Sequence, residues 1–174
     1  MVSTTVSPPL TSATPRAAFA VLILAVLAIG GAWFSQLVLG LKPCELCLLQ
    51  RWPYYIGLPL AFIAALLSHG NEHRSILTAL LLVLALIFVG SAGLGIYHAG
   101  VERKFWAGPS ACTGGYVAPA STDDFLKSLD GPAPVRCDQA AMRVLGLSLA
   151  GWNALISLLI AAIAWRGATA ARRG

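Results

Sequence analysis

The spacing of charged residues is the feature that most constrains this chain. Four long stretches carry no charged side chain, at 17–41, 52–71, 75–101 and 144–165. Each can hold about 20 apolar residues, the length at which an α-helix crosses the hydrocarbon core of a bilayer. We predict membrane spans near residues 17–39, 48–68, 76–98 and 143–165. Because charged residues make up only 11% of the chain, an ordinary soluble domain is excluded. The predicted fold is an all-α membrane protein, a four-helix transmembrane bundle with a long loop between helices 3 and 4.

The ends of the spans need two further interpretations. The first span could be a secretory signal, but its apolar run is longer than a signal core and starts behind a Pro/Ser/Thr-rich segment. We therefore expect a retained helix, with a disordered tail at 1–16 and a basic tail at 166–174. In the second span, Pro53 is tolerated near the helix start, whereas Pro59 is expected to kink the helix.

All four cysteines fall on one side of the predicted bundle. Four spans put both termini on one side and place the loops 40–47 and 99–142 together on the other. The first loop contains one pair of cysteines and the second loop contains the other, namely Cys44 with Cys47 and Cys112 with Cys137. This clustering follows from the number of spans, whatever the orientation of the protein in the membrane.

The orientation is predicted from charge and from cysteine usage. Arg166, Arg172 and Arg173 crowd the end of the last span, which favours cytoplasmic termini. Paired cysteines persist on the oxidising side of a membrane, which places the cysteine loops outside the cytoplasm. The net charge of +5 suits an anionic lipid leaflet, and no nucleic-acid-binding module accounts for it.

The first cysteine pair lies at the boundary of the second span. Two residues separate Cys44 from Cys47, a spacing that suits both zinc binding and redox chemistry. We expect Cys47 to open the helix, where the helix dipole lowers the pKa of a thiol. Arg51 follows four residues later and shares a helix face with Cys47. Its guanidinium is expected to stabilise the thiolate or to donate to an oxygen of an electron acceptor.

Three interpretations of the four cysteines remain open from the residues alone. They could form two structural disulfides that staple the loops. They could form a four-thiolate zinc site, although the 24 residues between Cys112 and Cys137 do not match a zinc knuckle. They could also form a relay of exchanging disulfides. A Cys44–Cys47 bond closes a very short loop and stabilises a fold little, which favours the relay.

Several motifs together resemble the DsbB family, the quinone-dependent disulfide bond formation proteins of the bacterial inner membrane. The resemblance covers residues 17–165, and no one motif carries it alone. The matching features are Cys44-x-x-Cys47-x-x-x-Arg51, the run Tyr97-His98-Ala99-Gly100-Val101-Glu102, the cysteines 112 and 137 in the second loop, and Gly146 to Asn153 at the entry to the fourth span.

The resemblance implies a function and a role for each site residue. Cys112 would form a mixed disulfide with a periplasmic DsbA-like thiol oxidase, and Cys137 would be its partner. Electrons would pass to Cys44 and Cys47, through a transient Cys44–Cys137 bridge. Cys47 would deliver them to ubiquinone or menaquinone, which Arg51 would polarise. The resemblance also implies that His98 lies near the quinone ring, that no metal takes part, and that the cysteine loops are periplasmic.

Two rival functions and one departure from the family pattern accompany this hypothesis. One rival is a membrane scaffold with structural disulfides. The other is a thiol enzyme of the vitamin K epoxide reductase type, in which the cofactor-side cysteine pair is expected near a later span. Met142 stands where a tryptophan is expected in relatives, which bears on how the second loop docks. Asn153 and Trp152 are expected to pack helices.

Overall fold

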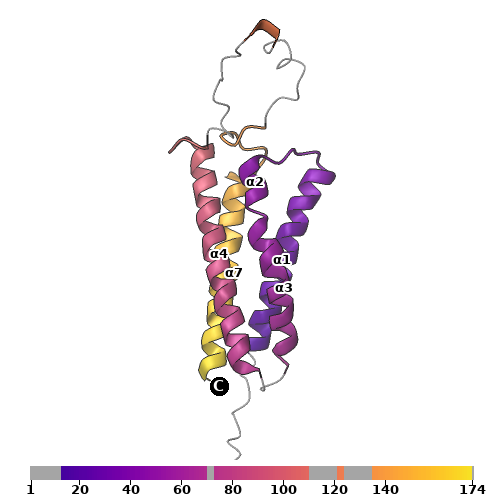
Figure 1. Ribbon diagram of the computed structural model, residues 1–174, viewed down its shortest axis with the longest axis vertical. Coiled ribbons are helices and arrows are strands. Elements are labelled where there is room, and N and C mark those ends of the chain that lie inside the picture. The colour runs from indigo at the N-terminus through magenta and orange to yellow at the C-terminus, as the bar shows by residue number, and fades with distance from the viewer. Residues whose placement is uncertain (1–12, 70–72, 110–120, 124–134, 174) are drawn as a thin grey trace, which may run out of the picture.

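The computed structural model describes residues 13–69, 73–109, 121–123 and 135–173. These residues form a bundle whose long helices run alternately up and down, so that the C-terminus lies at the end opposite to α2 (Figure 1). The helices are α1 (Ala13–Leu37), α2 (Glu45–Leu49), α3 (Trp52–Leu67), α4 (Arg74–Glu102) and α7 (Leu149–Arg173). The prediction of an all-α bundle of four long helices is confirmed.

The second predicted span is divided into two helices. The five-residue α2 stands above the 16-residue α3, and Gln50 and Arg51 lie between them (Figure 1). Pro53 has no N–H to donate and occupies the first turn of α3, where helix N–H groups have no intrahelical partner. Helix α3 continues through Pro59. The break therefore lies at the boundary of the span, immediately after the first cysteine pair.

Small and aliphatic side chains fill the interior of the bundle. Helix α4 packs most extensively against α7, and α1 packs against both α7 and α3. The buried core is centred on Phe88, Leu81 and Ile160 and includes many alanines, which let helix backbones approach closely. Within the described residues, α1, α4 and α7 are each long and apolar enough to cross a membrane.

Helix α7 begins later and ends later than the predicted fourth span. Residues Arg143–Val144 (β1) and Leu147–Ser148 (β2) form a short antiparallel hairpin instead of helix. Its turn has positive φ angles at Leu145 and Gly146, the geometry of a two-residue hairpin turn. At the other end, Ala168 and Ala171 are fully buried in the bundle, so the segment expected to be a basic tail is helical as far as Arg173.

A close approach of α4 to α7 provides a test of this packing. A Cβ atom on Gly95 would lie 2.9 Å from the backbone nitrogen of Ala154, whereas a Cβ on Gly93 would meet nothing within 4 Å. Gly95→Ala should therefore force the two helices apart and destabilise the fold by about 1–3 kcal/mol. Gly93→Ala should leave stability unchanged or raised, because alanine favours helix by up to about 1 kcal/mol over glycine.

The measurement is the unfolding midpoint of each purified variant in mixed detergent micelles, followed by circular dichroism. Equal midpoints for the two variants would contradict the close packing of α4 against α7.

Candidate functional site

Cys44 and Cys47 lie at the start of α2, and Cys44 is the residue that caps this helix. The backbone of Cys44 is extended, and its sulfur accepts a hydrogen bond from the backbone N–H of Cys47 at 3.3 Å. The two sulfurs are 2.8 Å apart and are not bonded, so the structure represents the dithiol state of this pair. Cys44 is buried and Cys47 is half-buried. The short helix thus holds the two thiols in direct contact.

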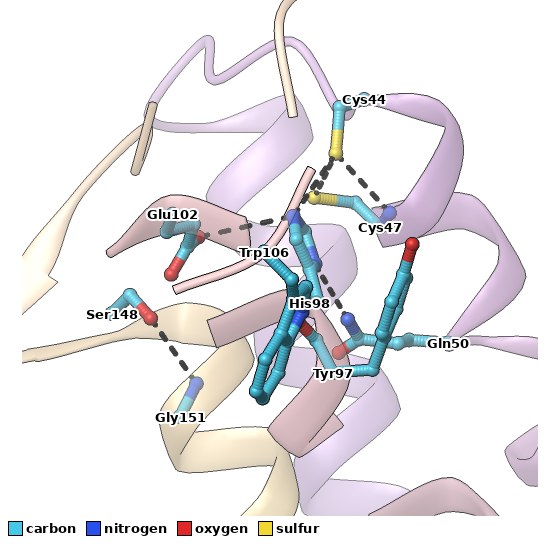
Figure 2. A network of polar contacts seen from close by, with 9 residues as sticks. All are labelled: Cys44, Cys47, Gln50, Tyr97, His98, Glu102, Trp106, Ser148 and Gly151. Carbon is cyan, nitrogen blue, oxygen red and sulfur yellow. Dashed lines mark hydrogen bonds and ion pairs between the residues drawn. The ribbon is translucent and has the colours of Figure 1, made fainter. Parts of the chain in front are cut away.

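His98, near the end of α4, points its imidazole ring toward this pair of sulfurs (Figure 2). Its Nε2 atom lies 3.6 Å from the sulfur of Cys44, and its Nδ1 atom lies 2.6 Å from the side-chain nitrogen of Gln50. An amide nitrogen can only donate, so Nδ1 accepts this bond and Nε2 carries the hydrogen that points to the Cys44 sulfur. Glu102, one turn further along α4, places a carboxylate oxygen 3.9 Å from Nε2.

These contacts make the two thiols chemically unequal. The hydrogen bond from the Cys47 thiol, aided by His98 and by the backbone N–H of Cys47, lowers the pKa of Cys44 to about 4 against an ordinary value of 9.0. The same pairing raises the pKa of Cys47, because that thiol donates its proton to the neighbouring thiolate, and burial acts in the same direction. In the dithiol state, Cys44 is the thiolate and Cys47 keeps the shared proton.

This assignment differs from the sequence prediction, which gave the lowered pKa to Cys47. The prediction placed the start of the helix at Cys47, whereas α2 begins at Glu45. Cys44 therefore occupies the capping position, where unpaired N–H groups of the first turn stabilise an anion. The pKa of Cys47 is raised instead, since its nearest polar neighbour is a thiolate.

Arg51 lies at the break between α2 and α3 and is almost completely buried. It donates from Nη1 to the side-chain oxygen of Gln36 at 2.7 Å and from Nη2 to the carbonyl of Ala32 at 3.4 Å. Its guanidinium carbon lies 5.2 Å from the ring centroid of Trp33, within the range of a cation–π contact. Among the described residues, Arg51 has no carboxylate partner, so α1 holds this buried cation through neutral groups.

A cavity of about 420 Å³ opens beside Cys47 and Arg51. Most of its wall is apolar, and α1 and α7 contribute Ile29, Phe34 and Ile156 among other side chains. Its polar wall includes Cys47, Gln50, Arg51, Tyr54, His98 and Asn153. An apolar cavity of this size with a few convergent polar groups is typical of a site for a small organic molecule.

Two residues of this wall bear on the sequence predictions. Met142 lines the cavity, so the position at which the chain departs from the family pattern faces the same space as Cys47. Asn153 does connect helices as predicted, since it accepts a hydrogen bond of 2.7 Å from the hydroxyl of Tyr54 in α3. It also lines the cavity.

A second cavity, of about 290 Å³, also adjoins the cysteine pair. Its lining includes Cys44, Cys47 and His98 together with Arg136 and Gln139. Cys47 and His98 therefore line both cavities, whereas Cys44 lines only the second one. The cysteine pair therefore lies where an apolar cavity adjoins a smaller and more polar one.

Cys137 lies beside this second cavity and is fully buried. It packs in one hydrophobic cluster with Cys44 and Leu46, and Cys47 packs against this cluster. Cys137 is disulfide-bonded, which removes its sulfur from any four-thiolate zinc site in this state. Cys112, the predicted partner of Cys137, lies outside the described residues.

Three residues that shape this site were given no role by the sequence patterns. Gln50 fixes the proton on His98, Glu102 places negative charge beside the same ring, and Gln36 binds Arg51. Gln50 follows Cys47 by three residues, and Glu102 follows His98 by four. Residues at these two spacings share a helix face. Those spacings could have indicated both residues, whereas the Gln36 contact depends on how α1 packs.

Comparison with known proteins identifies the family of this chain. The model of the family described as "Disulfide bond formation protein DsbB" matches residues 14–166. The chain belongs to the DsbB family. It is a multi-pass membrane protein of a family of disulfide-forming oxidoreductases.

Curated relatives agree with this assignment. The chain is 32% identical over 145 residues to Disulfide bond formation protein B 1 of Pseudomonas fluorescens strain Pf-5, which covers 81% of this chain and 80% of the relative. It is 33% identical over 147 residues to the protein of the same name from Pseudomonas savastanoi, covering 81% and 80%. An uncharacterised protein of Rickettsia prowazekii is 22% identical over 139 residues, covering 79% and 77%. No solved structure matches the chain.

Proposed function

We propose that this DsbB family protein reoxidises a periplasmic DsbA-like dithiol carrier and passes the electrons to a membrane quinone. The observation that carries the proposal is that the Cys44–Cys47 pair adjoins two cavities of different polarity. One side of the pair adjoins the segment that contains Cys137, and the other adjoins an apolar space. A pair so placed can exchange disulfides with Cys137 and deliver electrons to a lipid-soluble acceptor.

The proposed exchange conserves electrons and protons at each step. The two thiols of the carrier reduce a Cys112–Cys137 disulfide, and the carrier leaves as a disulfide. The resulting Cys112 and Cys137 thiols reduce a Cys44–Cys47 disulfide in the same way. Each step moves two electrons and two protons, and each proceeds by attack of a thiolate on a disulfide sulfur. The shared burial of Cys44 and Cys137 in one cluster supports a transient bond between these two sulfurs.

The unequal thiols support a direction for the later steps. The main cause of the raised pKa of Cys47 is the adjacent Cys44 sulfur. Once Cys44 is bonded to Cys137, Cys44 is no longer a thiolate, so the pKa of Cys47 falls. Cys47 then becomes the available nucleophile, on the wall of the apolar cavity. His98 can donate from Nε2 to a Cys44 thiolate and so stabilise it whenever it is released.

The residues around the apolar cavity fit a quinone. Ubiquinone or menaquinone would supply an acceptor for two electrons and two protons. The apolar side chains of α1 and α7 would bind the ring and exclude water. Arg51, a buried cation without a carboxylate partner among the described residues, would donate from its remaining N–H groups to a ring oxygen. His98 lines the same space and would lie near the ring.

The proposed location is the bacterial inner membrane, with both termini in the cytoplasm and the cysteine end of the bundle in the periplasm. Arg172 and Arg173 form a basic last turn of α7 at the end opposite to the cysteines, as expected for a cytoplasmic helix end. Labelling with a membrane-impermeant thiol reagent tests this orientation, because reduced cysteines should react in intact spheroplasts without permeabilisation of the inner membrane.

A trapping experiment tests the proposed function. In the Cys137→Ala variant, the Cys112 thiolate can attack the disulfide of an oxidised thioredoxin-fold carrier, which forms a mixed disulfide and leaves one carrier thiol free. Because Cys137 is no longer present to displace the carrier from Cys112, this complex should accumulate. The complex should be visible on non-reducing gels and should disappear on reduction. The matched control is the double variant Cys112→Ala and Cys137→Ala, which should form none. A Cys137→Ala variant that traps no carrier through Cys112 would contradict the proposed relay.

A further inference from the structure

Cys44, Cys47 and His98 form a cluster of metal-ligating side chains at the start of α2. Their three ligand atoms all lie within 4.8 Å of one another. Cys44 and His98 are buried, and Cys47 is half-buried. We propose that in the dithiol state this cluster is a binding site for a soft divalent cation such as Zn²⁺, with two thiolates and one imidazole as ligands.

The distances are close to those that Zn²⁺ requires. Zn–S bonds of about 2.3 Å and Zn–N bonds of about 2.0 Å in a tetrahedral site place sulfur and nitrogen about 3.6 Å apart and two sulfurs about 3.8 Å apart. The sulfur of Cys44 already lies 3.6 Å from Nε2 of His98. The two sulfurs are 2.8 Å apart and need to separate by about 1 Å. The two-residue spacing of the cysteines is that of one half of a zinc knuckle.

Gln50 and Glu102 provide the surroundings that such a site needs. A metal-bound histidine usually hydrogen-bonds through its other ring nitrogen, and Gln50 contacts Nδ1 at 2.6 Å (Figure 2). The carboxamide can turn over and accept from Nδ1–H when Nε2 binds a cation. Glu102, whose side chain is 6% exposed, lies 3.9 Å from Nε2 and places a carboxylate next to the imidazole ligand.

Binding at this site depends on the oxidation state of the cysteine pair. The dithiol can supply two thiolates, which neutralise the charge of the cation, whereas a Cys44–Cys47 disulfide supplies none. Two metal–sulfur bonds form on binding, any thiol proton is released to solvent, and no electron is transferred. A bound cation would hold both sulfurs as ligands. It would therefore stop their exchange with Cys137 until the metal is removed.

The experiment uses the full chain in detergent with Cys112 and Cys137 replaced by serine, so that Cys44 and Cys47 are its remaining thiols. The protein is reduced, freed of reductant and titrated with Zn²⁺, and the bound metal is measured by equilibrium dialysis and elemental analysis. Cd²⁺ serves as a second probe, because sulfur-to-cadmium charge-transfer absorption reports thiolate ligation directly. We expect one ion per reduced chain and none per oxidised chain.

Single substitutions identify the ligands. Gln50→Leu leaves all three ligands in place and should weaken zinc binding about 10- to 100-fold, the usual effect of losing the partner of a metal-bound histidine. His98→Ala should weaken it at least as much. His69→Ala is the matched control, because His69 is an exposed histidine that follows α3 at the other end of the bundle, and it should not change the affinity.

Two results would overturn the proposal. One is zinc binding by the oxidised chain equal to that of the reduced chain. The other is unchanged affinity in both the His98→Ala and Gln50→Leu variants, each checked for helical content by circular dichroism. The titration contains neither carrier protein nor quinone, so its outcome does not depend on the proposed electron relay.

Discussion

Replacing Cys47 by alanine should raise the pKa of Cys44 by several units, from about 4 toward the ordinary thiol value of 9.0. The Cys47 thiol donates the hydrogen bond that contributes most to the low value, and alanine cannot replace it. His98 and the backbone N–H of residue 47 remain, so a part of the depression should persist. Because a thiolate forms above the pKa of its thiol, reactivity that begins near pH 4 should move to neutral or alkaline pH.

The measurement is the pH profile of Cys44 alkylation in reduced protein, followed by mass spectrometry of the labelled peptide. The midpoint of the profile is the useful quantity, since a thiolate of higher pKa is also more nucleophilic and the rate at one pH mixes both effects. Cys47→Ser keeps an O–H donor and should give an intermediate midpoint. The assignment of the thiolate to Cys44 fails if the unaltered protein already titrates near pH 9, or if Cys47→Ala leaves the midpoint in place.

Replacing Arg51 by leucine should lower kcat/KM for quinone about 10- to 150-fold, mainly through KM. This range corresponds to loss of one hydrogen bond from a charged donor, about 1.5–3 kcal/mol. The buried guanidinium donates to Gln36 and to Ala32, which leaves further N–H groups for a ligand in the adjoining cavity. Steady-state reduction of a soluble quinone by a reduced carrier gives the kinetic constants, and calorimetric titration with a quinone analogue gives the affinity.

Three further variants separate a binding role for Arg51 from a structural one. Gln36→Ala removes the hydrogen bond from α1 but keeps the cation, so its KM should change much less. Arg51→Lys keeps the charge without the planar fork of donors, so its KM should lie between those of Gln36→Ala and Arg51→Leu. Arg166→Leu removes an exposed arginine from the opposite end of the bundle and should have no effect. An Arg51→Leu variant with unchanged KM and unchanged affinity would exclude Arg51 from the quinone site.

The helices of this bundle were predictable because their cause is local. Long apolar stretches must satisfy their backbone polar groups internally in a membrane, and a helix does so whatever its neighbours are. The ends were less predictable. Helix α7 continues to Arg173 because Ala168 and Ala171 pack within the bundle, and the hairpin before α7 depends on positive φ angles at Leu145 and Gly146.

The sequence indicated which residues would gather at the cysteine end of the bundle, but it did not indicate the contacts between them. The spacing of Cys44, Cys47 and Arg51 indicated a redox pair beside a cation, and both cysteines and Arg51 lie at one end of the bundle. The contact between Gln50 and His98 joins residues 48 positions apart and depends on the register of α4 against α2. The direction of Arg51 toward Gln36 likewise follows from how α1 packs. Such contacts arise from tertiary packing, which single-sequence patterns do not encode.

The placement of Cys47 and His98 on the walls of both cavities has a consequence for side reactions. Small thiols in water reduce free quinones readily, which would waste the oxidising power that a disulfide-forming system needs. With the proposed quinone in the apolar cavity, Cys47 and His98 would lie between it and thiols in the second cavity. In the proposed function, electrons would cross as a completed dithiol-to-disulfide conversion, which would keep the quinone apart from such thiols while coupling its reduction to protein oxidation.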